Sequence, residues 1–283
     1  MTETLPPLRE VIARHGIGAR RRLGQHFLLD LNLARRIVRA AGDLGGQTVV
    51  EIGPGPGGLT RALLETAAAR VIAIERDPRC VGALSDLAAL HGGRLRVVAG
   101  DALDTDIADF AGQGRVAIVA NLPYNVATPL LIGWLRRVDS IAAMTLMFQK
   151  EVAERIAAAP GSAAYGRLAV IVQWLCEARR VFDVAPAAFV PPPRVTSSVV
   201  RLVPRDAPLA AAGMADLEAV TAAAFGRRRK MLRSALNGLV EDPLALLSQA
   251  GIEPTVRAET LAPEAFCALA RALARIRDPR TAA

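Results

Sequence analysis

Short runs of β-branched residues alternate with helically spaced apolar residues from position 48 onward. The runs lack the polar-apolar alternation of a half-exposed strand, so we expect strands that are buried on both faces. They occupy residues 48–52, 70–75, 94–98, 115–119 and 144–148. Strands of this kind that are separated by helices form parallel sheets, because each helix carries the chain back to the starting edge. The pattern predicts an α/β fold with helices on both faces of a largely parallel sheet.

The strand pattern continues to about residue 205 and then stops. Two further runs, 180–184 and 197–203, are joined by a proline-rich loop, and we expect them to close the sheet as a hairpin. Residues 216–277 instead show a helical pattern that is interrupted by glycine and proline. We therefore predict two domains, an α/β domain over residues 1–205 and a small all-helical domain over residues 206–283.

The composition excludes several classes of protein. With 52% hydrophobic and 22% charged residues, the chain can bury a core, which excludes wholesale disorder. It lacks the run of about 18 apolar residues that a membrane-spanning helix needs, and residues 1–10 lack the apolar run of a signal peptide. Three scattered cysteines and three histidines make neither a disulfide framework nor a zinc site. We expect a cytoplasmic protein that binds no metal.

The first strand leads into a glycine-rich loop. Gly53, Gly55 and Gly58 match the G-x-G-x-x-G pattern of dinucleotide-binding loops. Glu75 ends the second strand, where an acid is well placed to bind ribose hydroxyls. A nicotinamide-dependent enzyme is therefore one interpretation, and a tight turn without a ligand is another.

Two acids favour S-adenosylmethionine over a nicotinamide cofactor. Glu51, two places before the first glycine, is typical of loops around the methionine part of S-adenosylmethionine. Asp101 follows the third strand, where it is placed to accept a hydrogen bond from an adenine amine. Neither acid decides the question alone.

The fourth strand leads into the tetrapeptide Asn121-Leu122-Pro123-Tyr124. An exocyclic adenine amine is a weak nucleophile, because its lone pair is delocalised into the ring. Acceptors for both amine hydrogens favour the developing cation in the transition state, and the side-chain oxygen of Asn121 and the carbonyl of Leu122 suit this role. Pro123 fixes the chain direction, and Tyr124 is expected to stack on the target base. The alternative is an ordinary strand-end turn, in which Asn and Pro are common.

Taken in order, these segments resemble those of the ribosomal RNA adenine N6-dimethyltransferases. Within that family, the resemblance is to the bacterial enzymes that dimethylate two adjacent adenines near the 3′ end of small-subunit (16S) rRNA. It covers most of the chain, through residues 21–28, 51–55, 75, 100–101, 121–125, 149–152, 164–168, 189–195 and 225–230. The resemblance implies a Rossmann-like class I methyltransferase sheet, S-adenosyl-L-methionine as cofactor, and a monomer that acts on an immature 30S particle during ribosome biogenesis.

The resemblance also implies individual site residues. The cofactor-binding positions are His26, Leu28, Gly53, Glu75, Asp101 and Asn121. His26 departs from the family, which usually has Asn there, although a neutral imidazole can still donate one hydrogen bond. Phe189 is expected to stack on the face of the target adenine opposite Tyr124. The alternatives are an exposed loop position for His26 and a core position for Phe189.

A net charge of +8 favours a polyanionic partner. The densest basic cluster lies on a predicted helix and comprises Arg227, Arg228, Arg229, Lys230 and Arg233. Its charge suits contacts with the rRNA backbone. Arg20–Arg22 form a second, smaller basic cluster. For both clusters the alternative is a solvated surface without a nucleic-acid partner.

Two related functions are weighed against this prediction. The family includes enzymes that modify large-subunit rRNA and confer macrolide resistance, but the helical C-terminus with residues 225–233 favours the small-subunit branch. The second alternative is an RNA-binding assembly or transcription factor that keeps the methyltransferase fold without needing its activity. Intact Glu75, Asp101 and Asn121 argue against this second alternative.

Overall fold

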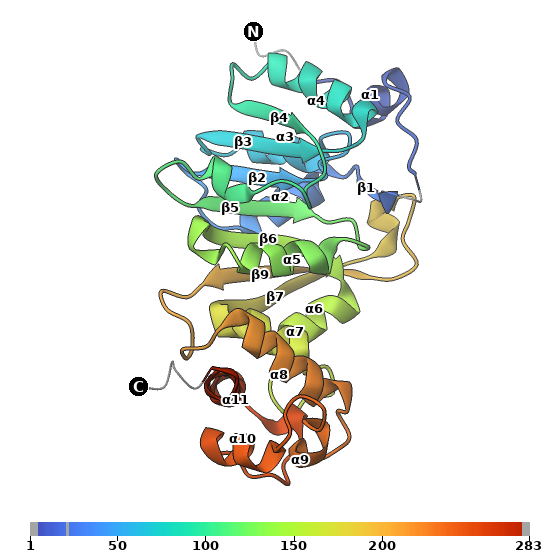
Figure 1. Ribbon diagram of the computed structural model, residues 1–283. Helices are drawn as coiled ribbons and strands as arrows, with labels where there is room; N and C mark the ends of the chain where they lie inside the picture. The colour runs from blue at the N-terminus through green and yellow to red at the C-terminus, as the bar shows by residue number, and fades with distance from the viewer. Residues whose placement is uncertain (1–4, 21–22, 279–283) are drawn as a thin grey trace. The chain divides into compact units, whose positions relative to one another are not determined.

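The chain folds around a seven-stranded sheet with the spatial order β4-β3-β2-β5-β6-β9-β7 (Figure 1). A computed structural model shows this sheet and describes residues 5–20 and 23–278. The strands are β2 (Thr48–Ile52), β3 (Arg70–Glu75), β4 (Leu95–Ala99), β5 (Val116–Asn121), β6 (Ile141–Gln149), β7 (Cys176–Val184) and β9 (Ser197–Pro204). The strands β2 to β6 pair in parallel, and β9 pairs antiparallel with β6. The predicted α/β fold with a largely parallel sheet is confirmed.

Two strands are longer than their sequence pattern indicates. β6 begins at Ile141 and β7 begins at Cys176, both earlier than predicted. The added part of β6 contains alanines, which carry no strand signal of their own. The added part of β7 includes the exposed Glu177 and Arg179, because this strand lies at the edge of the sheet. Pairing with neighbouring strands, rather than local preference, extends both strands.

Helices cover both faces of the sheet (Figure 1). In the first part of the chain they are α1 (Leu8–Arg14), α2 (Leu31–Ala40), α3 (Gly58–Leu64), α4 (Pro78–Ala89), α5 (Ala127–Leu135) and α6 (Lys150–Ile156). Asp30 and Asp77 begin α2 and α4, and each carboxylate accepts hydrogen bonds from backbone N–H groups of the first turn. These caps determine where the chain turns from each loop into its helix.

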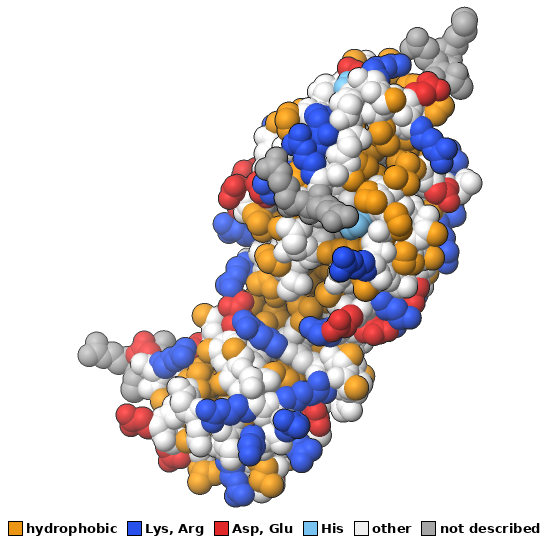
Figure 2. Space-filling view, turned by 90° about the vertical axis from the view of Figure 1, so that its right-hand side faces the viewer, with side chains coloured by type: hydrophobic (Ala, Val, Ile, Leu, Met, Phe, Trp, Pro, Cys, Tyr) orange, Lys and Arg blue, Asp and Glu red, His pale blue; other side chains and the backbone are white. Residues whose placement is uncertain are grey.

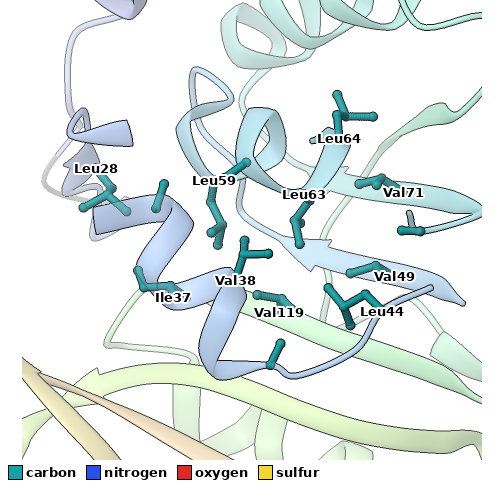
Figure 3. Close-up of a cluster of buried hydrophobic side chains, with 14 of the residues drawn as sticks. Leu28, Ile37, Val38, Leu44, Val49, Leu59, Leu63, Leu64, Val71 and Val119 are labelled. Carbon is teal, nitrogen blue, oxygen red and sulfur yellow. The ribbon is translucent and has the colours of Figure 1, made fainter. Parts of the chain in front are cut away.

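A buried apolar cluster joins α2 and α3 to one face of the sheet (Figure 3). Ile37 and Leu63 of the two helices meet Val49, Val71 and Val119 of three neighbouring strands. Because side chains alternate along a strand, the intervening residues of these strands face the opposite side of the sheet. The sheet is therefore buried on both faces, which holds the carboxyl ends of its strands in fixed positions.

The described residues divide into two compact units. The first ends at Ala153 and also includes Arg179–Pro204, and the second comprises Glu154–Ala178 and the residues after Pro204. The helices of the second unit are α7 (Arg167–Leu175), α8 (Met214–Gly226), α9 (Leu232–Ala235), α10 (Pro243–Ala250) and α11 (Pro263–Arg277). The expected boundary at residue 205 is one of the points where the chain passes between units. Residues 154–178, expected in the α/β domain, are grouped with the helices because α7 packs against α8 and α11.

The second unit has its own core. The ring of Phe225 lies between those of Tyr165 and Phe266, with ring centroids 5.9 Å and 5.4 Å away. The hydroxyl of Tyr165 donates to the backbone oxygen of Leu261 at 2.9 Å. This aromatic cluster ties the segment before α7 to α8 and α11.

The basic cluster of this unit does not lie on one helix, as the sequence predicted. α8 ends at Gly226, residues 227–230 form a turn, and Arg233 lies on the short helix α9. Arg228 explains the turn, since its guanidinium donates to the backbone oxygens of Ser162 and Ala163 and pairs with Glu259 at 2.7 Å. These bonds, which helical periodicity does not reveal, draw the chain out of the helix.

Among the described helices, none combines the length and the apolar character that a bilayer crossing requires. Within residues 5–20 and 23–278, no three side chains of His, Cys, Asp or Glu are grouped so that they hold a metal ion.

Candidate functional site

Most of the predicted site residues line one pocket at the carboxyl edge of the parallel strands. They are His26, Gly53, Glu75, Asp101, Asn121, Leu122, Pro123 and Tyr124. The parallel arrangement explains this, because the loops after β2, β3, β4 and β5 all leave the sheet at the same edge. The pocket also includes Gln25 and Phe27, so the segment before α2 forms part of its wall.

The glycine-rich loop lies against this wall. Gly53 and Gly55 both have positive φ angles, 62° and 57°, which favour glycine. A Cβ atom on Gly55 would come within 3.0 Å of the Phe27 ring. A Cβ atom on Gly58 would come even closer to the backbone oxygen of Leu28. The glycines therefore allow the loop to turn sharply and let residues 27–28 close over it.

Glu75 is buried at the end of β3, with 5% of its surface exposed. Its Oε2 accepts the N–H of Gly55 at 3.0 Å, and its Oε1 accepts the N–H of Asp77 at 2.8 Å. Burial raises the pKa of Glu75, and the hydrogen bonds from Asp77 and Gly55 act in the opposite direction. Each oxygen retains a further lone pair, so the carboxylate can still accept hydrogen bonds from a ligand.

Asp101 does not stand alone at the end of β4. Its Oδ2 pairs with Nη1 of Arg76 at 2.9 Å, and its Oδ1 accepts the N–H of Leu103 at 3.0 Å. Arg76 directly follows Glu75 and lines the same pocket. Arg76 was not among the predicted site residues, although its position beside Glu75 was a usable signal. The ion pair orients the Asp101 carboxylate between two strand ends.

Asn121 ends β5 and is oriented by one hydrogen bond. Its Nδ2 donates to the backbone oxygen of His26 at 3.1 Å. Because the amide nitrogen is engaged there, the orientation of the side chain leaves Oδ1 as an acceptor at the pocket. The end of β5 thus presents a polar acceptor to the pocket.

His26 lies beside Tyr124 rather than in an isolated loop. Their rings are stacked, with centroids 5.7 Å apart and an interplanar angle of 29°. Nδ1 of His26 donates to the carbonyl oxygen of Pro191 at 2.8 Å, which leaves Nε2 as the second polar atom of the ring. His26 therefore connects the pocket wall, the loop at Pro191 and the aromatic residue of the tetrapeptide.

Leu28 and Phe189 do not line the pocket with the other predicted residues. Both side chains are buried in the apolar cluster beneath it, with Phe189 only 2% exposed. They are partners in a two-stranded sheet formed by β1 (Phe27–Leu28) and β8 (Phe189–Val190). This pairing turns the Phe189 ring into the core, so the structure does not bring it to the face of a base opposite Tyr124.

Some residues near the site were not singled out from the sequence. Gln25 accepts the N–H of Arg20 and donates to Asp77 at 3.1 Å, which holds the pocket wall against the start of α4. Ser197 contacts the hydroxyl of Tyr124 at 2.6 Å. Neither residue carries a recognisable local signal, because both act through partners that are distant in sequence. Arg21 and Arg22 of the second basic cluster lie outside the described residues.

Glu51 is buried at the end of β2, beneath the glycine-rich loop. Its Oε2 and the hydroxyl of Thr60 both lack a hydrogen-bond partner within the described part of the chain. Burial raises the pKa of Glu51 to about 8, and the nearby carboxylate of Glu75 acts in the same direction. At neutral pH the buried carboxyl group is therefore largely protonated.

We expect Glu51→Gln to stabilise the protein at high pH and to have little effect at pH 5. The folded state holds the proton up to about pH 8, whereas the unfolded state releases it near 4.5, so wild-type stability falls as pH rises through this window. The melting temperature of the variant should exceed that of wild type by on the order of 10 °C at pH 9. Glu65→Gln, at an exposed position, is the control. If the melting temperatures of wild type and Glu51→Gln differed by the same amount at every pH, the raised pKa of Glu51 would be contradicted.

The fold and the site together define a Rossmann-like methyltransferase. A glycine-rich loop follows β2, Glu75 ends β3, Asp101 follows β4, and the tetrapeptide begins at the last residue of β5. A protein-family model described as ribosomal RNA adenine dimethylase matches residues 17–275, so the chain belongs to that family.

Individual relatives agree with the family. A ribosomal RNA small subunit methyltransferase A from Rhodospirillum rubrum is 62% identical over 269 residues, which cover 95% of this chain and 93% of the relative. A crystal structure of a dimethyladenosine transferase from Plasmodium falciparum is 28% identical, with a TM-score of 0.75 over 86% of this chain and 96% of that one. A structure of the 23S rRNA methyltransferase ErmE is 26% identical, with a TM-score of 0.66 over 88% and 99%. The predicted family and its methyl transfer to ribosomal RNA adenine are confirmed, and the nicotinamide interpretation is wrong.

Proposed function

We propose that this protein dimethylates N6 of two adjacent adenines near the 3′ end of 16S rRNA, within an immature 30S particle. The identity of 62% to a small-subunit rRNA methyltransferase supports this branch of the family over the large-subunit branch. The observation that carries the chemistry is the pocket in which the Asn121 amide and Tyr124 meet acids from two neighbouring strand ends. We propose further that the protein acts as a monomer in the cytoplasm.

The pocket fits S-adenosyl-L-methionine, which supplies an electrophilic methyl group on a sulfonium centre. Each carboxylate oxygen of Glu75 already accepts one backbone N–H. The remaining lone pairs would accept hydrogen bonds from the ribose hydroxyls. Asp101, oriented by Arg76, would accept from the adenine amine. Gly53, which lines the pocket and whose positive φ angle favours glycine, would lie against the methionine part. His26 would cover the cofactor from the side of the pocket wall.

The target adenine would enter beside Asn121. Oδ1 of Asn121 and the carbonyl of Leu122 would accept hydrogen bonds from the two amine hydrogens, which favours attack by the nitrogen lone pair. Pro123 holds this carbonyl in place through its restricted φ angle. Tyr124 would stack on the base. The methylated ammonium is acidic enough to lose its proton to water, so the site needs no general base.

The direct test is methyl transfer to immature small subunits from a strain that lacks these two modifications. With labelled S-adenosylmethionine, we expect label in 16S rRNA and two dimethylated adenines at adjacent positions near its 3′ end. Mature, fully modified subunits are the control and should accept no label. Binding to the subunits without any transfer would contradict the proposed activity and favour an assembly factor.

We propose that the helical domain, residues 206–283, supplies affinity for the rRNA backbone. Figure 2 shows several Lys and Arg side chains gathered on one face of the helical unit. Arg227, Arg229, Lys230 and Arg233 are exposed, whereas Arg228 is engaged by Glu259 and by two backbone oxygens. The exposed members suit phosphate contacts, whereas the guanidinium of Arg228 is already engaged within the unit.

Replacing Arg229, Lys230 and Arg233 with Gln should weaken binding to the small subunit and flatten its salt dependence. Each lost phosphate contact lowers the slope of log K against log salt by about 0.7–0.9, so the triple variant should lose roughly two units of slope. Filter binding across a salt series measures this effect. Arg277→Gln, which removes a charge from an exposed ion pair with Asp216 in the same unit, is the control, and we expect it to leave the slope unchanged. An unchanged slope in the triple variant would show that these residues do not contact the rRNA backbone and belong to a solvated surface.

A further inference from the structure

Tyr124 is anchored by a residue from a distant part of the chain. Its hydroxyl lies 2.6 Å from the hydroxyl of Ser197, the first residue of β9. Ser197 is completely buried, while Tyr124 is partly exposed in the pocket. The hydrogen bond therefore fixes the far end of an aromatic ring whose face is open to a ligand.

The sheet explains how Ser197 reaches this position. β9 runs antiparallel to β6, so its first residue lies where β6 ends, and Ser197 pairs with Gln149. Asn121 at the end of β5 pairs with Met147 of the same strand β6. The start of β9 thus lies at the edge where β5 and β6 end. Tyr124 follows Asn121, the last residue of β5, by three positions.

The buried hydroxyl of Ser197 needs a hydrogen-bond partner. Leaving a hydroxyl without a partner in the interior costs free energy, so buried hydroxyls are normally hydrogen-bonded. The neighbouring Ser198 is equally buried, but its hydroxyl lies near the backbone oxygen of Phe182 and the guanidinium of Arg180. The hydroxyl of Ser197 instead contacts Tyr124.

We propose that Ser197 is a positioning residue for methyl transfer, holding the Tyr124 ring in the orientation that stacks on the target adenine. The proposal rests on the proposed function, because it concerns the same pocket. A tyrosine ring turns about two side-chain bonds. The hydrogen bond holds the hydroxyl in place and so restricts rotation about Cα–Cβ, while the stacked ring of His26 restricts rotation about Cβ–Cγ. Together with the stacked ring of His26, this bond would keep the stacking surface ready before the base arrives.

The first experiment detects the contact without cofactor or RNA. The sequence contains only two tyrosines, Tyr124 and Tyr165, so fluorotyrosine labelling gives two ¹⁹F resonances. Tyr124→Phe identifies the resonance of Tyr124. In Ser197→Ala we expect that resonance to shift or broaden while that of Tyr165 stays in place. Ser198→Ala, an equally buried serine on the same strand, should change neither.

The second experiment measures the reaction. Ser197→Ala should slow single-turnover methyl transfer roughly three- to tenfold, the size expected for one hydrogen bond between uncharged groups, with cofactor affinity unchanged. Ser197→Thr keeps the hydroxyl and should restore most of the rate. Tyr124→Phe removes the other half of the contact, so adding Ser197→Ala to it should cause little further loss.

The outcomes separate this proposal from the proposed function. An unchanged Tyr124 resonance in a folded Ser197→Ala variant would overturn the contact. A changed resonance with a wild-type rate would overturn its role in the reaction. If wild type itself transfers no methyl group, the proposed function fails and the role in transfer fails with it, while the resonance still reports the contact.

Discussion

Asn121→Ala should lower the single-turnover rate of methyl transfer about a hundred- to a thousandfold. The loss of one preorganised hydrogen-bonding group that acts on charge developing in the transition state typically has an effect of this size. Asn121 is well preorganised, because its Nδ2 donates to the backbone oxygen of His26 and its oxygen is thereby oriented as an acceptor. The rate is measured with immature small subunits at saturating S-adenosylmethionine, since the same side chain is also proposed to bind the cofactor.

The binding of RNA should change far less than the rate. We expect the affinity of Asn121→Ala for the small subunit to stay within a few-fold of wild type, because one amide is a small part of the contact. Asn125→Ala is a matched comparison, since Asn125 lines the same pocket four residues later. Its rate should fall much less. A rate for Asn121→Ala within about a factor of three of wild type would contradict the proposed role.

Glu75→Ala should weaken the binding of S-adenosylmethionine roughly ten- to a hundredfold. Hydrogen bonds from hydroxyls to a carboxylate contribute about 1.5–3 kcal/mol, and about 1.4 kcal/mol corresponds to a tenfold change in affinity. The structure adds a second reason for a large effect. Glu75 also accepts the N–H of Gly55, so its removal frees the glycine-rich loop, which is proposed to bind the cofactor.

Calorimetry with S-adenosylhomocysteine measures this loss. Glu65→Ala removes the same charge from an exposed position, where Glu65 pairs with Arg35, and its affinity should match that of wild type. A melting temperature near that of wild type would show that the Glu75→Ala variant is folded. If such a variant bound the cofactor with wild-type affinity, Glu75 would not be a cofactor-binding residue.

Local patterns in the sequence predicted the strand ends and the residues that follow them. β-branched runs identify buried strands, and a parallel sheet brings the loops after those strands to a single edge. Glu75, Asp101 and Asn121 each sit at or directly after a strand end, so their positions follow from the strand pattern alone. The structure brings all three into one pocket, as this reasoning requires. Their roles toward cofactor and base stay predictions until tested.

The tertiary structure alone decided which way several side chains face. Leu28 and Phe189 carry no local signal that separates a pocket residue from a core residue, and the pairing of β1 with β8 buries both. Helical periodicity likewise does not distinguish Arg228, which Glu259 engages, from its exposed neighbours. Ser197 reaches Tyr124 only because β9 runs antiparallel beside β6. The sequence by itself determined the elements and where they end, because these depend on neighbouring residues. Contacts between distant segments depend on how those elements pack, and only the folded chain contains that information.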